Sequence, residues 1–159
     1  MGRLELVREK VSLGTLLNEV QESLSPLFKN KGLEFGLVIK EGIPAEVVTD
    51  PHALTRIARN LLSNAAKFSP SGEQVMVSVR PVDGQVRIAV SDRGPGIPED
   101  FRDKLFDKFT QADASTTRKY GGSGLGLAIC KLIIDGHGGE IGVDSQKDEG
   151  STFFFSIPA

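Results

Sequence analysis

The sequence predicts an α/β fold of the α+β kind, a two-layer sandwich in which three helices cover one face of a mixed, mostly antiparallel sheet of about five strands. Two patterns lead to this prediction: apolar residues recur at helical spacing in three segments, and they alternate with polar residues in two neighbouring segments. With 159 residues, 39% of them hydrophobic, the chain has the size of one domain with its own core.

The predicted helices follow from apolar spacing and from capping residues. The first covers 13–27, and Pro26 is expected to bend or loosen its last turns. The second begins after Asp50, a favourable N-cap, with Pro51 at the first helical position. The third covers about 125–135 and follows a polar loop over 111–122.

The predicted strands come from alternation. Segments 75–79 and 86–90 alternate strictly and are joined through Gly84, which predicts an antiparallel hairpin. Segment 33–39 is a further strand candidate, and 139–143 with 152–157 predict a second hairpin at the end of the chain.

Composition excludes several classes of function. A formal net charge of −2 provides no broad basic surface, so we expect neither nucleic acid nor direct membrane contact. Cys130 is the one cysteine, which excludes a disulfide framework and a cysteine metal cluster and is typical of a reducing cytosol. No segment approaches the roughly 18 apolar residues of a membrane span, and residues 1–3 lead into no hydrophobic region of the kind found in signal peptides. We therefore expect a cytoplasmic domain, whether or not its parent chain is membrane-anchored.

Asn60, Asn64 and Lys67 are spaced four and three residues apart, so they share one stripe of the second helix. An amide oxygen such as that of Asn64 suits Mg²⁺, which takes few protein ligands and keeps waters and substrate phosphates. Lys67 would add positive charge beside those phosphates. The same spacing also describes an ordinary solvated helix face, and this pattern alone leaves both interpretations open.

Asp92 ends the second alternating segment, and counting in twos from Val86 places it on the apolar face of its strand. A buried carboxylate needs a hydrogen-bond donor, and the exocyclic amine of adenine is one. Guanine presents an acceptor there, so this hypothesis predicts preference for ATP over GTP. Gly94 and Gly96 permit close ligand approach, although Asp-x-Gly-x-Gly alone is equally a turn.

Gly122, Gly124 and Gly126 lead into the third helix, where free N–H groups and the helix dipole favour phosphate. A dinucleotide-binding motif is rejected, because its last glycine would fall on Leu127 or Ile129 and a polar loop precedes it. No Gly-Lys-Ser/Thr phosphate loop occurs in the sequence.

Phe106 and Phe109 are spaced as on a small amphipathic helix that packs on the core. We expect their rings to anchor the front edge of the polar loop. Arg118 and Lys119 are the cations of that loop able to reach phosphates, although exposed loop cations are usually only solvated.

In order, segments 60–67, 92–96, 106–109 and 122–127 resemble the N, G1, F and G2 boxes of the ATP-binding catalytic domain of sensor histidine kinases. That domain belongs to the GHKL superfamily, with gyrase, heat-shock chaperones and mismatch-repair ATPases. The resemblance covers nearly the whole chain. Segment 150–153 is similar to the trailing glycine segment of the family, and 111–120 is similar to the lids of hybrid sensor kinases.

The resemblance implies a GHKL-type fold with ATP and Mg²⁺ as cofactors. It implies that Asn64 binds the metal with help from Asn60, that Asn60, Asn64 and Lys67 support catalysis, and that Asp92 recognises adenine. The implied ATP-binding residues are Asn60, Asn64, Lys67, Phe68, Asp92, Gly94, Gly96, Ile97, Phe109, Arg118, Lys119, Gly122, Ser123, Gly124, Leu125, Gly126, Leu127 and Thr152.

Two departures matter, one from the related ATPases of the superfamily and one from the histidine kinases. Related ATPases carry a glutamate at the position of Asn60, where it acts as general base, and its absence costs about 10²–10⁴ in rate. Slow hydrolysis, with ATP held for another nucleophile, is therefore favoured. Neither His52 nor His137 fits the phosphoacceptor of the family, which lies on a separate helical hairpin.

The sequence thus predicts the catalytic domain of a two-component sensor kinase, with the end of a linker and a first strand in 1–10 and the ATP-binding domain in 11–159. It would transfer the ATP γ-phosphoryl group to a histidine on a dimerisation domain absent from this chain, for relay to a response regulator receiver domain. We expect a monomeric fragment of a homodimeric parent. The alternatives are a GHKL ATPase or serine kinase, or a catalytically inactive nucleotide-binding docking module.

Overall fold

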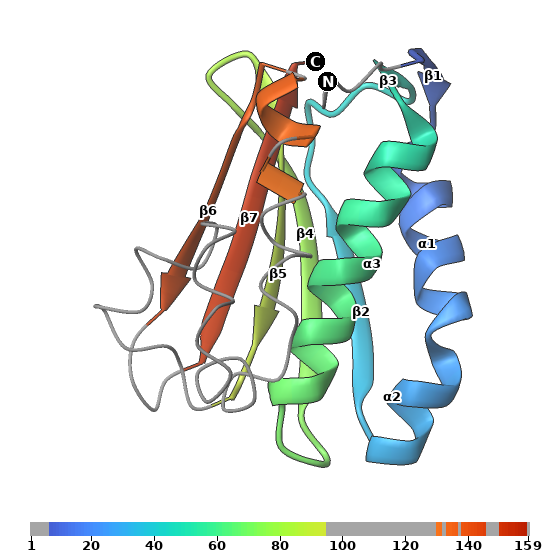
Figure 1. Ribbon diagram of the computed structural model, residues 1–159, viewed down its shortest axis with the longest axis vertical. Helices are drawn as coiled ribbons and strands as arrows, with labels where there is room; N and C mark the ends of the chain where they lie inside the picture. The colour runs from blue at the N-terminus through green and yellow to red at the C-terminus, as the bar shows by residue number, and fades with distance from the viewer. Residues whose placement is uncertain (1–6, 95–129, 132, 137, 146–149, 159) are drawn as a thin grey trace, which may run out of the picture.

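The computed structural model describes residues 7–94, 130–131, 133–136, 138–145 and 150–158, and it places helices over one face of a five-stranded sheet (Figure 1). The described elements are, in chain order, β1 (Glu9–Val11), α1 (Leu13–Ser23), α2 (Ser25–Lys31), β2 (Glu34–Ile39), β3 (Val47–Thr49), α3 (Pro51–Phe68), β4 (Gln74–Val82), β5 (Gln85–Asp92), β6 (Glu140–Ser145) and β7 (Ser151–Pro158). Residues 130–131 and 133–136 are helical, in agreement with the end of the predicted third helix.

The main sheet has the strand order β2-β4-β5-β7-β6. Strands β2 and β4 are parallel and the other neighbours are antiparallel, which confirms the predicted mixed, mostly antiparallel sheet. Asp83 and Gly84 join β4 to β5 with φ angles of 50° and 78°, as a tight hairpin turn requires. A first strand was predicted in 1–10, but β3 and the separate sheet that it forms with β1 were not, because a strand of three residues is too short to show alternation.

The predicted single helix over 13–27 is wrong. Helix α1 ends at Ser23, and a separate helix α2 begins at Ser25. Leu24 lies between them with φ −100° and ψ 4°, outside helical values. Pro26 is the physical reason, because it has no N–H to continue the hydrogen-bond ladder and suits only the first turn of a new helix.

Helix α3 is held at both ends by side chains. Asp50 is the N-cap as predicted, and its Oδ1 accepts hydrogen bonds from the backbone N–H groups of His52 and Ala53 at 3.0 and 3.1 Å. Its Oδ2 accepts a bond from the N–H of Val7 at 2.9 Å. At the other end, Lys31 Nζ of α2 donates to the last carbonyls of the helix, those of residues 66 and 67, at 2.8 and 2.6 Å.

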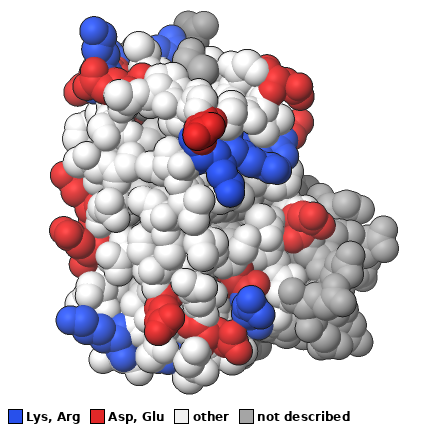
Figure 2. Space-filling model, turned by 180° about the vertical axis from the view of Figure 1, so that it is seen from behind, with Lys and Arg blue, Asp and Glu red and all other residues white. Residues whose placement is uncertain are grey.

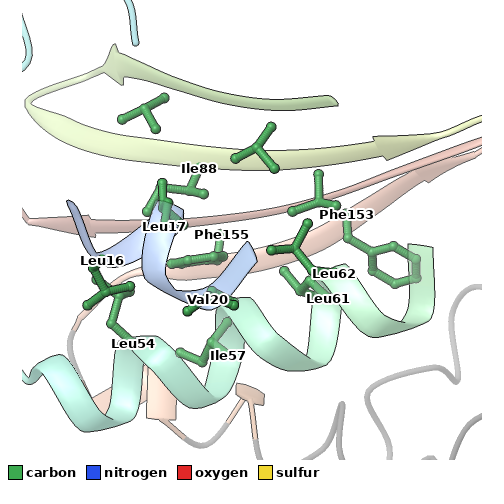
Figure 3. Close-up of a cluster of buried hydrophobic side chains, with 14 of the residues drawn as sticks. Leu16, Leu17, Val20, Leu54, Ile57, Leu61, Leu62, Ile88, Phe153 and Phe155 are labelled. Carbon is green, nitrogen blue, oxygen red and sulfur yellow. The ribbon is translucent and has the colours of Figure 1, made fainter. Parts of the chain in front are cut away.

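The core lies between α3 and the sheet, with α1 packed on α3 (Figure 3). Leu54, Ile57 and Leu61 of α3 are completely buried, at the spacing that predicted the helix. The labelled side chains that meet there are Leu16, Leu17, Val20, Leu54, Ile57, Leu61, Leu62, Ile88, Phe153 and Phe155. This packing fixes one face of α3 and leaves an adjacent stripe for other contacts.

Seen from behind, the molecule presents a broad uncharged surface with charged side chains in small groups (Figure 2). Arg87 of β5 has its guanidinium 4.5 Å from the ring centroid of Phe154 and 3.7 Å from the Glu140 carboxylate. Arg80 lies directly opposite Arg87 on the neighbouring strand β4.

Candidate functional site

Helix α3 places the predicted polar stripe on successive turns of its second half. Asn60 and Asn64 are half-buried beside the apolar face, and Lys67 is exposed one turn further on. Asn60 donates a hydrogen bond through Nδ2 to the sulfur of Cys130, at 3.7 Å. The stripe therefore lies next to the helical segment that contains Cys130.

Asp92 is the last residue of β5, and its side chain is buried, with 6% of the residue exposed. It shares its face with Val86, Ile88 and Val90, which confirms the count in steps of two. Its Oδ1 accepts a hydrogen bond from the backbone N–H of Gly94 at 2.8 Å.

Burial raises the pKa of the Asp92 carboxyl above its usual value, and backbone hydrogen bonds from Gly94 and Ser151 oppose that rise. A carboxylate offers about four acceptor positions on its two oxygens, so these two donors leave capacity for a third. A buried acceptor with spare capacity suits a ligand that brings an N–H donor.

Two glycines permit the close approach of chain segments around Asp92. A Cβ on Gly94 would lie 2.6 Å from the carbonyl oxygen of Phe68, the last residue of α3. A Cβ on Gly150 would overlap the carbonyl oxygen of Asp92, and the φ of Gly150 is +87°. The end of α3, the end of β5 and the start of β7 therefore meet at one place.

Thr152 lies on β7 opposite Ser91, and the two hydroxyl oxygens are 2.9 Å apart. Because successive side chains of a strand point to opposite faces, the Thr152 hydroxyl lies on the other face of the sheet from Asp92. A contact of Thr152 with a ligand on the Asp92 side would run through its backbone.

The remaining predicted site residues lie outside the described part of the chain, as do the phenylalanine helix and the polar loop. They are Gly96, Ile97, Phe109, Arg118, Lys119, Gly122, Ser123, Gly124, Leu125, Gly126 and Leu127.

The described donors fit Mg²⁺ held together with phosphate. Within the described ranges, no group of three or more His, Cys, Asp or Glu side chains is arranged to hold a metal. Asn60 and Asn64 supply hard amide oxygens, and Mg²⁺ takes one or two such ligands when phosphates and water complete its shell.

No described helix has the length and apolar character needed to cross a membrane.

Three contacting residues were missed by sequence reasoning: Lys31, Cys130 and Ser151. The bonds from Lys31 to the end of α3 and from Asn60 to Cys130 join residues 35, 36 and 70 positions apart, which no local pattern reveals. The pairing of Ser151 with Asp92 joins β5 to β7, two strands whose pairing no local pattern indicates.

Comparisons with known proteins agree with this geometry. Residues 49–159 match the family of histidine kinase-, DNA gyrase B- and HSP90-like ATPases. The signal transduction histidine-protein kinase BarA of Escherichia coli strain K12 is 40% identical over 160 residues, which cover 98% of this chain and 17% of BarA.

Solved structures give the same result. Full-length ShkA in complex with AMPPNP matches with a TM-score of 0.85 and 33% identity, over 99% of this chain and 32% of ShkA. The catalytic domain of the histidine kinase ThkA matches with a TM-score of 0.81 and 27% identity, over 98% of this chain and 96% of that domain. ThkA in complex with the response regulator protein TrrA matches with a TM-score of 0.77 and 25% identity, over 96% of this chain and 42% of the ThkA chain.

The chain therefore belongs to the histidine kinase-, DNA gyrase B- and HSP90-like ATPase family, as the ATP-binding catalytic domain of a histidine kinase, which confirms the resemblance stated from its motifs. The chain spans 17% of the length of BarA.

Proposed function

We propose that this chain binds Mg-ATP beside the second half of α3 and the adjoining ends of β5 and β7. It would supply the γ-phosphoryl group to a histidine on a separate dimerisation domain. We propose a cytoplasmic location, with the end of a linker and a first strand in 1–10 and the catalytic domain in 11–159. The observation that carries the proposal is the contact of Gly94 with the carbonyl of Phe68, which joins the asparagine stripe to the buried Asp92.

The side chains of this chain divide the binding task. Asp92 would accept a hydrogen bond from the adenine amine, since it is buried and retains acceptor capacity beyond Gly94 and Ser151. Asn64, with Asn60, would hold Mg²⁺, which when bound neutralises phosphate charge. Lys67 would add a point charge at the same end of α3. Catalysis would then consist of positioning and charge neutralisation.

The residues outside the described ranges keep their proposed roles on the strength of their motifs. Gly96, Ile97 and Phe109 would line the nucleotide, Arg118 and Lys119 would reach its phosphates, and segment 122–127 would present backbone N–H groups to them.

A response regulator receiver domain is the proposed final acceptor. The ThkA structure, which contains a response regulator protein, supports this class of partner. The immediate partner would be the dimerisation and histidine-phosphotransfer domain of the same, homodimeric parent.

Binding is tested by calorimetric titration of the chain with Mg-ATP and Mg-GTP. We expect ATP to bind and GTP to bind much more weakly. Asp92→Asn should weaken ATP binding by at least about tenfold, because a hydrogen bond to a charged group contributes about 1.5–3 kcal/mol. Asp144→Asn, an exposed position on β6, is the matched control and should bind as the original chain does.

Phosphotransfer is tested by adding the dimerisation hairpin of a related kinase and following its phosphorylation. Asn64→Ala should abolish the product, and Asn18→Ala, exposed on α1, should not. ATP binding without transfer would favour the inactive docking module, whereas steady Mg-dependent hydrolysis by the chain alone would favour an ATPase. Unchanged transfer by Asn64→Ala would remove that residue from the mechanism.

A further inference from the structure

The hydrogen bond between Asn60 and Cys130 joins a residue of the proposed metal site to a buried sulfur atom. Cys130 is 0% exposed and lies in the helical segment that follows the glycine-rich stretch. Its sulfur accepts from Asn60 Nδ2 at 3.7 Å, a normal distance for a bond to sulfur. The contact links α3 to an element 70 residues further along the chain.

The two ends of an asparagine amide are chemically opposite. Nδ2 carries two donor hydrogens and Oδ1 carries acceptor lone pairs, so only Oδ1 can face a cation. An acceptor fixed on one side of the amide holds Nδ2 there and turns Oδ1 to the opposite side. Cys130 is an acceptor of the Asn60 amide, and its burial in the core keeps the sulfur in place.

Packing alone does not require sulfur at position 130. A buried cysteine behaves as a small apolar side chain, and its neighbours in the same segment, Ile133 and Ile134, are also buried. Valine would fill a similar volume without offering an acceptor, whereas serine keeps a polar atom on the same Cβ.

We propose that Cys130 is a positioning residue for magnesium-dependent nucleotide binding, because its sulfur holds the Asn60 amide with Oδ1 directed away from the core. This inference rests on the proposed function, in which Asn60 assists Asn64 at the metal. Cys130 itself touches neither metal nor nucleotide in this proposal.

The test measures ATP affinity by calorimetry twice, in excess EDTA and in excess Mg²⁺, and takes the ratio of the two. The ratio reports the coupling between metal and nucleotide, whereas a general packing defect changes both affinities alike. For Cys130→Val, we expect the ratio to fall roughly three- to tenfold, the range of one lost hydrogen bond, with the EDTA affinity unchanged. Cys130→Ser should restore the ratio, and Ile134→Val is the packing control and should keep it.

Each other outcome overturns the inference in a distinguishable way. A Cys130→Val ratio equal to the original refutes the positioning role and leaves the proposed function intact. Equal loss in EDTA and Mg²⁺ assigns Cys130 to packing alone. An original chain whose ATP affinity does not respond to Mg²⁺ refutes this inference together with the metal part of the proposed function. Thermal melting confirms folding, and Cys130→Ala replaces the valine variant if that variant fails to fold.

Discussion

Replacement of Asp50 by alanine should destabilise the domain by about 2–3 kcal/mol. The residue is 7% exposed, and its carboxylate accepts three backbone hydrogen bonds, from Val7, His52 and Ala53. Loss of a helix N-cap costs about 1 kcal/mol, and loss of a further bond to a charged group adds about 1.5 kcal/mol. Asp50→Asn should cost less, about 1.5 kcal/mol, because an amide oxygen can keep both Oδ1 bonds and only the Val7 bond loses its acceptor.

The effect of Asp50 should depend on pH. Burial alone would raise its pKa, but the backbone donors of Val7, Ala53 and His52, with the charge of His52, lower the pKa below its usual 3.8. A lowered pKa in the folded state stabilises the fold above the unfolded-state pKa, and this stabilisation is lost as pH falls through the folded-state pKa. The free-energy difference between the original chain and Asp50→Ala should thus be fully present at about pH 6 and shrink below about pH 4.

Urea unfolding at several pH values, followed by circular dichroism, measures both effects. Asp144→Ala, at an exposed position on β6, is the control and should change stability little at any pH. Equal losses for Asp50→Asn and Asp50→Ala would refute the division between the two carboxylate oxygens. A difference that stays constant down to pH 3 would refute the electrostatic part of the reasoning.

Three further predictions concern other contacts. Gly94→Ala should lower the free energy of unfolding by about 1–3 kcal/mol and weaken ATP binding, because the added Cβ would lie 2.6 Å from the Phe68 carbonyl oxygen. Urea unfolding measures the stability and calorimetry the binding, and unchanged values would contradict the close approach of these two segments. Lys31→Met should cost about 0.5–1.5 kcal/mol in urea unfolding by removing donors from the last carbonyls of α3, whereas exposed Lys29→Met should be nearly neutral. Burial raises the pKa of the Cys130 thiol to about 11, so iodoacetamide should label it at pH 8 only in denaturant, and rapid labelling of the folded chain would contradict its burial.

Local rules of the chain predict the elements that position the site. Alternation predicts β4 and β5 and also the burial of Asp92, because a side-chain period of two leaves no other face for it. Asp50 and Pro51 predict the start of α3, since both act on the first turn alone.

Features that depend on distant partners could not be predicted. The face on which the Thr152 hydroxyl lies depends on the pairing of β7 with β5, which neither strand's own pattern reveals. The bond from Asn60 to Cys130 requires the third helix to be placed against α3, and a helical pattern gives no information on that placement.

The environment of Asn60 bears on whether water or histidine attacks the γ-phosphate of bound ATP. An amide cannot accept a proton from water, and the pKa of Cys130, raised by burial to about 11, keeps that neighbour a neutral thiol at physiological pH. Neither Asn60 nor Cys130 can therefore serve as the general base, the role of the glutamate that related ATPases of the superfamily carry at the position of Asn60. A missing base costs about 10²–10⁴ in the rate of attack by water, but a histidine side chain needs no such help, because its neutral ring nitrogen is already a nucleophile. Under the proposed function, this pair would make hydrolysis slow and leave transfer to histidine unimpeded, which is the selectivity required of a domain that holds ATP until its acceptor arrives.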